Sequence, residues 1–321
     1  MCVTQNLAII AIGGNSLITD ANHKTVEDQY NAICQTVQHI ADVVESGRQV
    51  VVTHGNGPQV GFILLRSEIA RKEGLHPVPL VSCVANTQGA LGWQIQQALE
   101  NELYKRGVEG NHGRVVTVVT QVRVAADDPG FNNPDKFIGE FYPEENIEAI
   151  QASHPGWVLK KDANRGYRRV VASPVPAEII ELDVIRTLVA AGFNVVAVGG
   201  GGIPVVENDD GELRGVAAVI DKDLATRLLA NELNAETLII STGVKQVCVH
   251  YGTPKQQALG DIKAEALRSY AKEGHFPAGS MGPKVKAALD FLAAGGKEAI
   301  ITCPDNLKQA LSGAGCTRIT K

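Results

Sequence analysis

The sequence lacks any apolar run close to the roughly 20 residues that a helix needs to cross a bilayer. Its N-terminus lacks the basic segment and the longer apolar stretch of a signal peptide. A basic surplus is missing too, because 30 lysines and arginines stand against 35 aspartates and glutamates, a net charge of −5. We therefore expect a cytoplasmic protein with no membrane and no nucleic acid among its partners. A local group of lysines could still bind an anionic small molecule.

Cysteine pairs and recognisable metal-ligand clusters are missing as well. Six cysteines are spread along the 321 residues, and none forms a C-x-x-C pair. Cysteines spaced in this way are typical of reduced thiols in a cytosolic protein. We predict no metal site made by the protein alone.

Two common phosphate-binding signatures are also absent. The chain contains no G-x-x-x-x-G-K-[ST] sequence, which argues against a P-loop. It contains no G-x-G-x-x-G sequence either, since Gly55, Gly57 and Gly61 are spaced one residue too far apart. A dinucleotide site of the Rossmann type is therefore disfavoured.

What the sequence does contain is a set of short apolar runs that end in glycine-rich turns. Such runs are typical of buried parallel strands, and open α/β sheets bind ligands at the carboxyl ends of their strands. Glycines at those ends let backbone N–H groups approach an anion. We therefore predict a phosphate site spread over several loops. The runs with their turns are Leu7–Ile12 with Gly13-Gly14-Asn15, Val50–Val52 with Thr53–Pro58, Val195–Val198 with Gly199–Pro204, and Leu238–Ile240 with Ser241–Gly243.

Helical periodicity alternates with these strands. Ile33, Val37, Ile40 and Val44 fall at helical spacing, and residues 178–191, 223–234 and 283–294 repeat that pattern. The first helix is expected to begin near Thr25 and Asp28 and to end before Gly47. This order predicts an α/β fold with a mostly parallel central sheet and helices on both faces. A composition of 44% apolar and 20% charged residues supports a compact core.

The stretch 123–169 departs from this rhythm. Four prolines interrupt it, and its aromatic residues could still be buried. We predict a small inserted lid subdomain within a single domain of residues 1–321. The alternative is a long loop without a function of its own.

Two lysines occupy positions that favour an anion. Lys222 directly precedes the helix that Asp223 could cap, and Lys284 follows Pro283, a residue suited to the first position of a helix. A cation at the positive end of a helix dipole is unfavourable unless an anion joins it. The alternative is two solvated surface lysines. Asp223 and Asp221 have competing roles, as a helix cap or as a partner that positions Lys222.

Other candidates are weaker. His54 lies in a tight turn, where a histidine is more often structural than catalytic. The arginines of the Gly166 segment could bind an anion or simply pair with nearby acids; they are Arg165, Arg168 and Arg169.

Taken together, several segments of the chain resemble the carbamate kinases, a branch of the amino-acid kinase fold family, over nearly the whole length. Individually these motifs are weak, but their order and spacing are specific. They are Ala11–Asn15, Thr53–Gly61, Gly166–Val171 with Ser173-Pro174, Gly199–Pro204, Ala218–Asp223 and Gly279–Lys284.

The resemblance implies an open three-layer αβα sandwich that works as a homodimer in arginine metabolism. It implies reversible phosphoryl transfer between ATP and carbamate, giving ADP and carbamoyl phosphate, run towards ATP formation in catabolism. Mg²⁺ would accompany the nucleotide with few protein ligands. Carbamate already carries a nucleophilic oxygen anion, so catalysis reduces to positioning and charge neutralisation.

The resemblance also assigns site residues. Lys222 and Lys284 would clamp phosphate oxygens, Asp223 would orient them, and Lys136 would reach the carbamate from the lid. Residues expected to bind the substrate and its phosphate are Gly13, Gly14, Asn15, Gly55, Asn56, Gly57, Gly201 and Gly202. Residues expected to bind the nucleotide are Thr242, Gly243, Met281 and Pro283.

Four positions differ from the usual family pattern, namely Phe137, Glu140, Lys245 and His250. They leave the phosphoryl-transfer residues unchanged and bear on the lid and the nucleotide half. Two alternatives therefore stay open: a kinase of another small carboxylate, and a weakly active nucleotide-binding regulatory protein.

Overall fold

The computed structural model describes residues 6–13, 17, 25–108, 113–162, 166–277 and 280–321. A central eight-stranded sheet has the order β15-β17-β16-β12-β1-β2-β9-β3. All its pairings are parallel except that of β16 with β17. The strands are β1 (Leu7–Ile12), β2 (Gln49–His54), β3 (Val115–Thr117), β9 (Asn194–Val196), β12 (Thr237–Ser241), β15 (Asp261–Lys263), β16 (Glu298–Thr302) and β17 (Thr317–Thr320).

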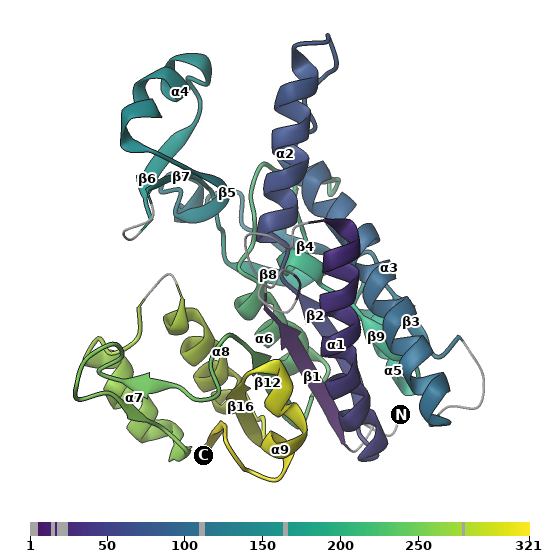
Figure 1. The fold of residues 1–321 in the computed structure, drawn as a ribbon. Helices are drawn as coiled ribbons and strands as arrows, with labels where there is room; N and C mark the ends of the chain where they lie inside the picture. Colours follow the sequence, from purple (N-terminus) through teal and green to yellow (C-terminus); the bar gives the residue numbers. More distant parts are fainter. Residues whose placement is uncertain (1–5, 14–16, 18–24, 109–112, 163–165, 278–279) are drawn as a thin grey trace.

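Helices cover both faces of this sheet (Figure 1). In β1, Leu7 and Ile9 belong to one core cluster and Ala8 and Ile10 to the other, because successive side chains point to opposite faces of a strand. The first cluster includes residues of α5 (Leu182–Ala190), α6 (Lys222–Glu232), α7 (Ala264–Lys272) and α8 (Met281–Ala293). The second includes residues of α1 (Val26–Glu45), α3 (Leu80–Arg106) and α9 (Leu307–Leu311). The predicted three-layer fold is confirmed.

Helix ends follow the local sequence, with two corrections. Thr25 caps α1 in a capping box with Asp28, as predicted. In α6, however, the capping residue is Asp221 and not Asp223, because the helix begins at Lys222. Helix α8 begins at Met281, so Pro283 is its third residue rather than its first. A proline is tolerated there because the first N–H groups of a helix have no partner within it.

Two smaller sheets flank the central one. A four-stranded sheet has the order β11-β10-β4-β8, and a two-stranded ribbon joins β13 to β14. Their bounds are β4 (Gln121–Val124), β8 (Pro176–Ile179), β10 (Ile203–Glu207), β11 (Leu213–Gly215), β13 (Cys248–Val249) and β14 (Gln257–Ala258). Short 3₁₀ turns occur at η2 (Pro129–Phe131), η3 (Glu144–Asn146), η4 (Gly199–Gly201) and η5 (Pro304–Asn306).

A separate three-stranded sheet, β5-β7-β6, stands away from the central layers beside α2 (Gly57–Arg71) (Figure 1). It consists of β5 (Lys136–Tyr142), β6 (Val158–Lys161) and β7 (Tyr167–Val171), with α4 (Ile147–Ser153) between β5 and β6. We call this part, residues 136–171, the inserted unit. The sequence predicted the bounds 123–169, but the start of that range belongs to β4 of the four-stranded sheet, and β7 continues to Val171. A Cβ atom on Gly61 of α2 would lie 2.7 Å from Gly139 Cα, so the backbones of α2 and β5 approach closely there.

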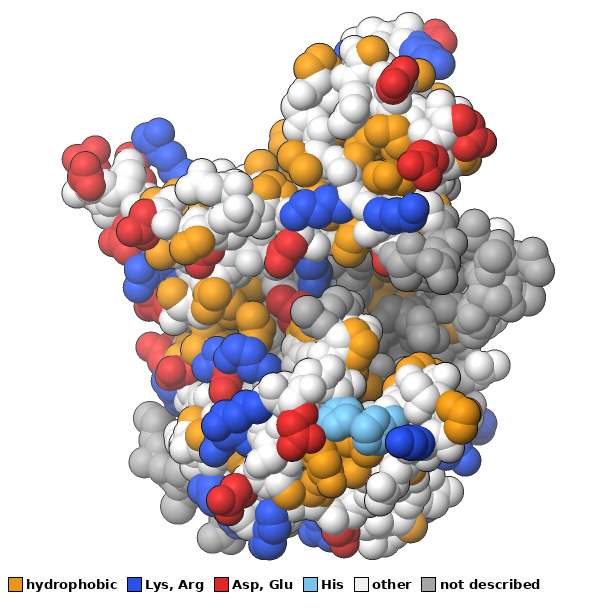
Figure 2. Space-filling model, turned by 90° about the vertical axis from the view of Figure 1, so that its left-hand side faces the viewer, with side chains coloured by type: hydrophobic (Ala, Val, Ile, Leu, Met, Phe, Trp, Pro, Cys, Tyr) orange, Lys and Arg blue, Asp and Glu red, His pale blue; other side chains and the backbone are white. Residues whose placement is uncertain are grey.

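No helix among the described residues is long and apolar enough to span a membrane. On the face shown in Figure 2, acidic and basic side chains are interspersed, without a broad field of lysine and arginine among the side chains described there.

Candidate active site

A cleft of about 750 Å³ opens where the central strands end. Strand β1 leads into Gly13, β2 into Gly55 and β12 into Thr242, and all three residues line the cleft. The carboxyl ends of the glycine-terminated strands therefore meet, as the strand pattern predicts. The predicted site residues that line the cleft are Gly13, Gly55, Asn56, Gly57, Lys136, Lys222, Asp223, Thr242, Gly243, Met281, Pro283 and Lys284.

Four predicted residues are not among the lining residues. Gly14 and Asn15 lie outside the described part of the chain. Gly201 and Gly202 have φ angles of 92° and 90°, and in η4 it is Gly200 that lines the cleft. A Cβ atom on Gly201 would lie 2.5 Å from the Ile220 carbonyl oxygen, and one on Gly202 would lie 2.2 Å from a Val122 methyl carbon. Both glycines thus permit packing behind the turn.

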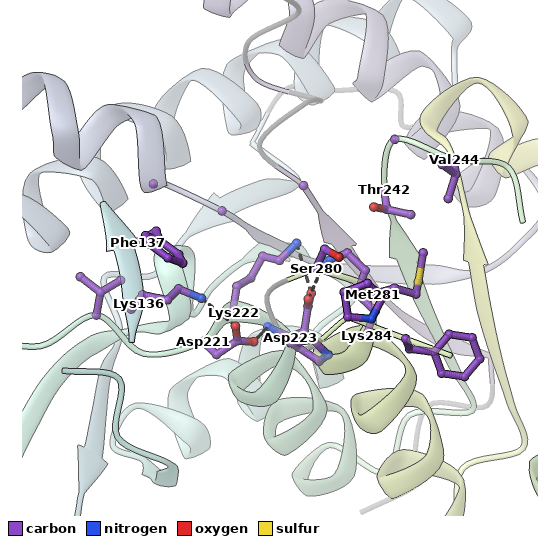
Figure 3. A pocket seen from close by; sticks show the side chains of 18 of the residues that line it. Lys136, Phe137, Asp221, Lys222, Asp223, Thr242, Val244, Ser280, Met281 and Lys284 are labelled. Atoms are coloured by element: carbon purple, nitrogen blue, oxygen red, sulfur yellow. Dashed lines mark hydrogen bonds and ion pairs between the residues drawn. The ribbon is translucent and has the colours of Figure 1, made fainter. Parts of the chain in front are cut away.

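Asp223 joins two lysines at the centre of the cleft (Figure 3). Its Oδ1 lies 3.2 Å from Lys222 Nζ, and its Oδ2 accepts a hydrogen bond of 2.8 Å from Lys284 Nζ. Lys222 Nζ also donates to the Ile12 carbonyl at the end of β1, at 3.2 Å. The first turns of α6 and α8 thus bring residues that are 61 positions apart into one ion-pair network.

Burial and neighbouring charges have opposite effects on the pKa values in this network. Burial lowers the pKa of Lys222, while the Asp223 carboxylate raises it. Burial alone would raise the pKa of Asp223, yet the ammonium groups of Lys222 and Lys284 hold that pKa well below its usual range. Asp223 is therefore ionised, and it keeps two cations close together.

Asp221 also lines the cleft, although the sequence pointed to it only as a possible helix cap or partner of Lys222 and not as a site residue. Its Oδ2 accepts a hydrogen bond of 2.6 Å from Lys136 Nζ, and its Oδ1 caps α6. An acidic residue directly before a predicted helix was the available signal. Three lysines and two aspartates, Asp221 and Asp223, leave this group with one net positive charge, and the N-termini of α6 and α8 add to it. An anionic ligand would therefore be favoured.

The arginines of the β7 segment pair with acids or with rings. Arg168 lines the cleft, forms an ion pair of 3.0 Å with Asp162 and lies 4.9 Å from the Phe141 ring centroid. Arg169 lies 4.5 Å from the Trp157 ring centroid. Arg165 is outside the described residues.

The other half of the cleft is lined largely by apolar and aromatic side chains, among them Val244, Tyr251, Phe276 and Met281.

The four positions that differ from the family pattern lie in different places. His250 is exposed, with a φ angle of 52°, and its ring meets that of His275 edge-on, with the ring centroids 4.5 Å apart. Lys245 is exposed and Phe137 lines the cleft. Glu140 belongs to β5.

Among the described residues, no group of three or more histidine, cysteine, aspartate or glutamate side chains is arranged to hold a metal ion. The two aspartates of the cleft are both engaged by lysines. A divalent cation that entered with a nucleotide would thus find its main ligands on the phosphates.

His54 is buried and does not line the cleft, in keeping with a structural role. Burial lowers its pKa to about 4, with a smaller effect from the nearby Lys222 charge in the same direction. The pKa is about 6.5 in an unfolded chain. Between these two values the unfolded chain binds a proton that the folded protein does not, so stability falls as the pH falls.

We expect the free energy of unfolding to drop by up to about 3 kcal/mol from this residue alone between pH 6.5 and pH 4. Urea denaturation of the parent and of His54→Gln across this range would measure it. The variant should show a shallower loss, whatever its stability at pH 7. The exposed His76 provides the control, because His76→Gln should keep the parent slope. Equal slopes for the parent and His54→Gln would contradict the prediction.

Comparison with known proteins agrees with this geometry. The model of the amino acid kinase family matches residues 6–303. The carbamate kinase-like protein YahI of Escherichia coli K12 is 49% identical over 99% of both chains. The carbamate kinase of Pyrococcus horikoshii is 47% identical over 97% of this chain and 98% of its own. A solved structure, the carbamate kinase from Giardia lamblia bound to AMP-PNP, has a TM-score of 0.90 at 40% identity over all of both chains. The chain therefore belongs to the amino acid kinase family, within its carbamate kinase branch.

Proposed function

We propose that this chain is a kinase that transfers a phosphoryl group between carbamoyl phosphate and ADP, forming carbamate and ATP, and that the cell runs it towards ATP. The observation that carries the proposal is the Lys222–Asp223–Lys284 network at the strand ends. The relatives named carbamate kinase, and the one bound to the ATP analogue AMP-PNP, support the substrates.

In the ATP-forming direction, a terminal phosphate oxygen of ADP attacks the phosphorus of carbamoyl phosphate, and carbamate leaves as an anion. Neither group needs a proton removed, so the reaction requires no histidine base; His54 in particular is buried and does not line the cleft. Lys222 and Lys284 would lie against the oxygens of the transferred group and neutralise their charge. Asp223 would keep both lysines in place.

Mg²⁺ is part of the proposal as a companion of the nucleotide. When bound, it would neutralise charge on the nucleotide phosphates and hold them in one geometry. The protein residues near it would be Asp221 and Asp223. Their carboxylates already accept ammonium groups, which is consistent with few direct protein ligands.

We also propose that the protein acts in the cytoplasm, in arginine catabolism, as a homodimer. Two large side chains on the outer surface of α3 support self-association, since Trp93 is 56% exposed and Tyr104 is 55% exposed. Aromatic residues are enriched in protein interfaces.

The direct test measures ATP formed by the purified protein from ADP, Mg²⁺ and carbamoyl phosphate. We expect steady turnover with carbamoyl phosphate and little with acetyl phosphate at the same concentration. A preference for acetyl phosphate would favour a kinase of another small carboxylate. Nucleotide binding by calorimetry without ATP formation from either donor would favour a regulatory protein.

We propose that the inserted unit is a lid that closes over the substrate. Lids of this kind exclude water from the reaction and complete the site. Lys136 on β5 would then neutralise the carbamoyl group. We expect Lys136→Ala to raise the KM for carbamoyl phosphate at least about 10-fold, the equivalent of about 1.4 kcal/mol, while the KM for ADP changes little. Initial rates with each substrate varied in turn would measure both. Equal losses for the two substrates would contradict the role of Lys136.

A further inference from the structure

One carboxylate connects the inserted unit to the helix that carries Lys222. Asp221 Oδ1 accepts the backbone N–H groups of Asp223 and Leu224 at 2.9 and 3.3 Å, which caps α6. Its Oδ2 accepts the ammonium group of Lys136 at 2.6 Å. Figure 3 shows Lys136 reaching from the β5 side to Asp221 next to the lysine network. The two oxygens of one side chain therefore serve two different parts of the molecule.

The chain leaves the inserted unit at the same place. Ala172, directly after β7, accepts a backbone hydrogen bond of 3.0 Å from Val219 and forms a parallel bridge with Ala218. Lys136 is paired with Val171 in the β5–β7 register, so entry and exit lie side by side. Both therefore contact residues 218–221. The backbone bridge at Ala172 holds the point where the chain leaves the inserted unit. At the point of entry, by contrast, Lys136 can exchange Asp221 for another anion.

The surroundings of the ion pair allow such an exchange. The Lys136 side chain is 31% exposed and that of Asp221 is 19% exposed, so water and ligands can reach both. If Lys136 moves to another anion, the Asp221 carboxylate still accepts two N–H groups at the positive end of α6. Breaking the ion pair would therefore leave no buried charge without a partner.

We propose that Asp221 is a positioning residue, which holds Lys136 over the cleft before the substrate binds and releases it to the carbamoyl group afterwards. A free lysine side chain samples many rotamers, and fixing it on binding costs affinity. The ion pair with Asp221 restricts Lys136 beforehand. This inference rests on the proposed function for the identity of the substrate, but the contact itself can be tested without turnover.

Two variants separate the ion pair from the helix cap. Asn and Ser are both good N-cap residues, so Asp221→Asn and Asp221→Ser should keep α6 and the melting temperature close to those of the parent. Both lose the carboxylate. We expect the KM for carbamoyl phosphate to rise about 10-fold, with the KM for ADP within about twofold of the parent value. Glu144→Gln is the matched control, since it removes an exposed carboxylate that lies 3.8 Å from Lys161 within the inserted unit; both constants should stay unchanged.

A double-mutant cycle shows whether Asp221 acts through Lys136. We expect Asp221→Asn to add nothing to the carbamoyl phosphate KM in a Lys136→Ala background. Additive losses, or equal increases in both KM values for Asp221→Asn, would mean that Asp221 acts through α6 and would overturn the proposal.

Hydrogen exchange in the protein without ligands gives a readout independent of activity. Amides at the start of β5 should exchange faster in Asp221→Asn and Asp221→Ser than in the parent and in Glu144→Gln. Unchanged exchange would overturn the proposed tether. If the parent forms no ATP but the exchange differs as expected, the proposed substrate is wrong and the tether stands.

Discussion

Replacing Lys222 or Lys284 with alanine should lower kcat by about 10²- to 10³-fold, the loss seen when one preorganised partner of a developing charge is removed. Each ammonium group lies on one side of Asp223, at 3.2 and 2.8 Å, and each faces the cleft. In water such a charge would be screened, but the Lys222 side chain is only 12% exposed, so solvent can compensate little for its loss. Neither variant removes a large part of the apolar core.

The measurement is kcat for ATP formation, together with a thermal melt to show that the fold persists. Lys286→Ala is the matched control, because Lys286 lies two residues from Lys284 on α8, is 62% exposed and pairs only with Asp290 among the described ion pairs. It should keep the parent kcat. Near-parental kcat in both Lys222→Ala and Lys284→Ala would show that the network does not carry the chemistry.

Replacing Asp223 with asparagine should cost both stability and activity. The carboxylate side chain is 4% exposed and separates two ammonium groups. Removing one partner of a buried charge network typically costs about 3–5 kcal/mol, because the remaining charges lose their compensation. We expect a decrease of that size in the free energy of unfolding at pH 7, and little remaining turnover because the lysines are no longer held in place.

The pH dependence distinguishes this explanation from a simple packing defect. Burial already lowers the pKa of Lys222, and without Asp223 that pKa should fall further. Between the folded value and about 10.5, the unfolded chain binds a proton that the folded protein lacks, so stability rises with pH in that window. The deficit of Asp223→Asn should therefore shrink as the pH is raised from 7 towards 10. Asp290→Asn, a change at a partly exposed carboxylate on α8, is the control and should show little deficit. A deficit of Asp223→Asn that is constant with pH would contradict the charge argument.

The local features of the fold could be predicted because they depend on neighbours in the sequence. The alternation of β1 between two core clusters follows from its unbroken apolar run. The capping box of Thr25 with Asp28, and the left-handed Gly47 with a φ of 84°, follow from residue types at fixed offsets. The meeting of the glycine turns at one edge follows from parallel strand order.

Tertiary contacts decided what the sequence left ambiguous. Asp221 and Asp223 flank Lys222, and either could cap a helix. The helix begins at Lys222, so Asp221 keeps an extended backbone, with φ −69° and ψ 121°, and its side chain turns back to the N-terminus. Asp223, inside the first turn, faces Lys284 instead. The partner of Asp221 is 85 residues away in β5, a distance over which local patterns carry no information.

The glycines of the Gly199–Gly202 turn also show what the sequence could predict and what only the tertiary structure decided. Positive φ, close approach to a ligand and close approach to other backbone all select glycine, so composition alone could not separate Gly200, which lines the cleft, from Gly201 and Gly202, which pack behind it. The sequence by itself determined the layered α/β fold, the glycine-rich strand ends and the lysines at two helix starts, because these depend on local periodicity and capping. Only the tertiary structure decided which carboxylate faces which lysine, because that depends on where the helices begin and how they pack together.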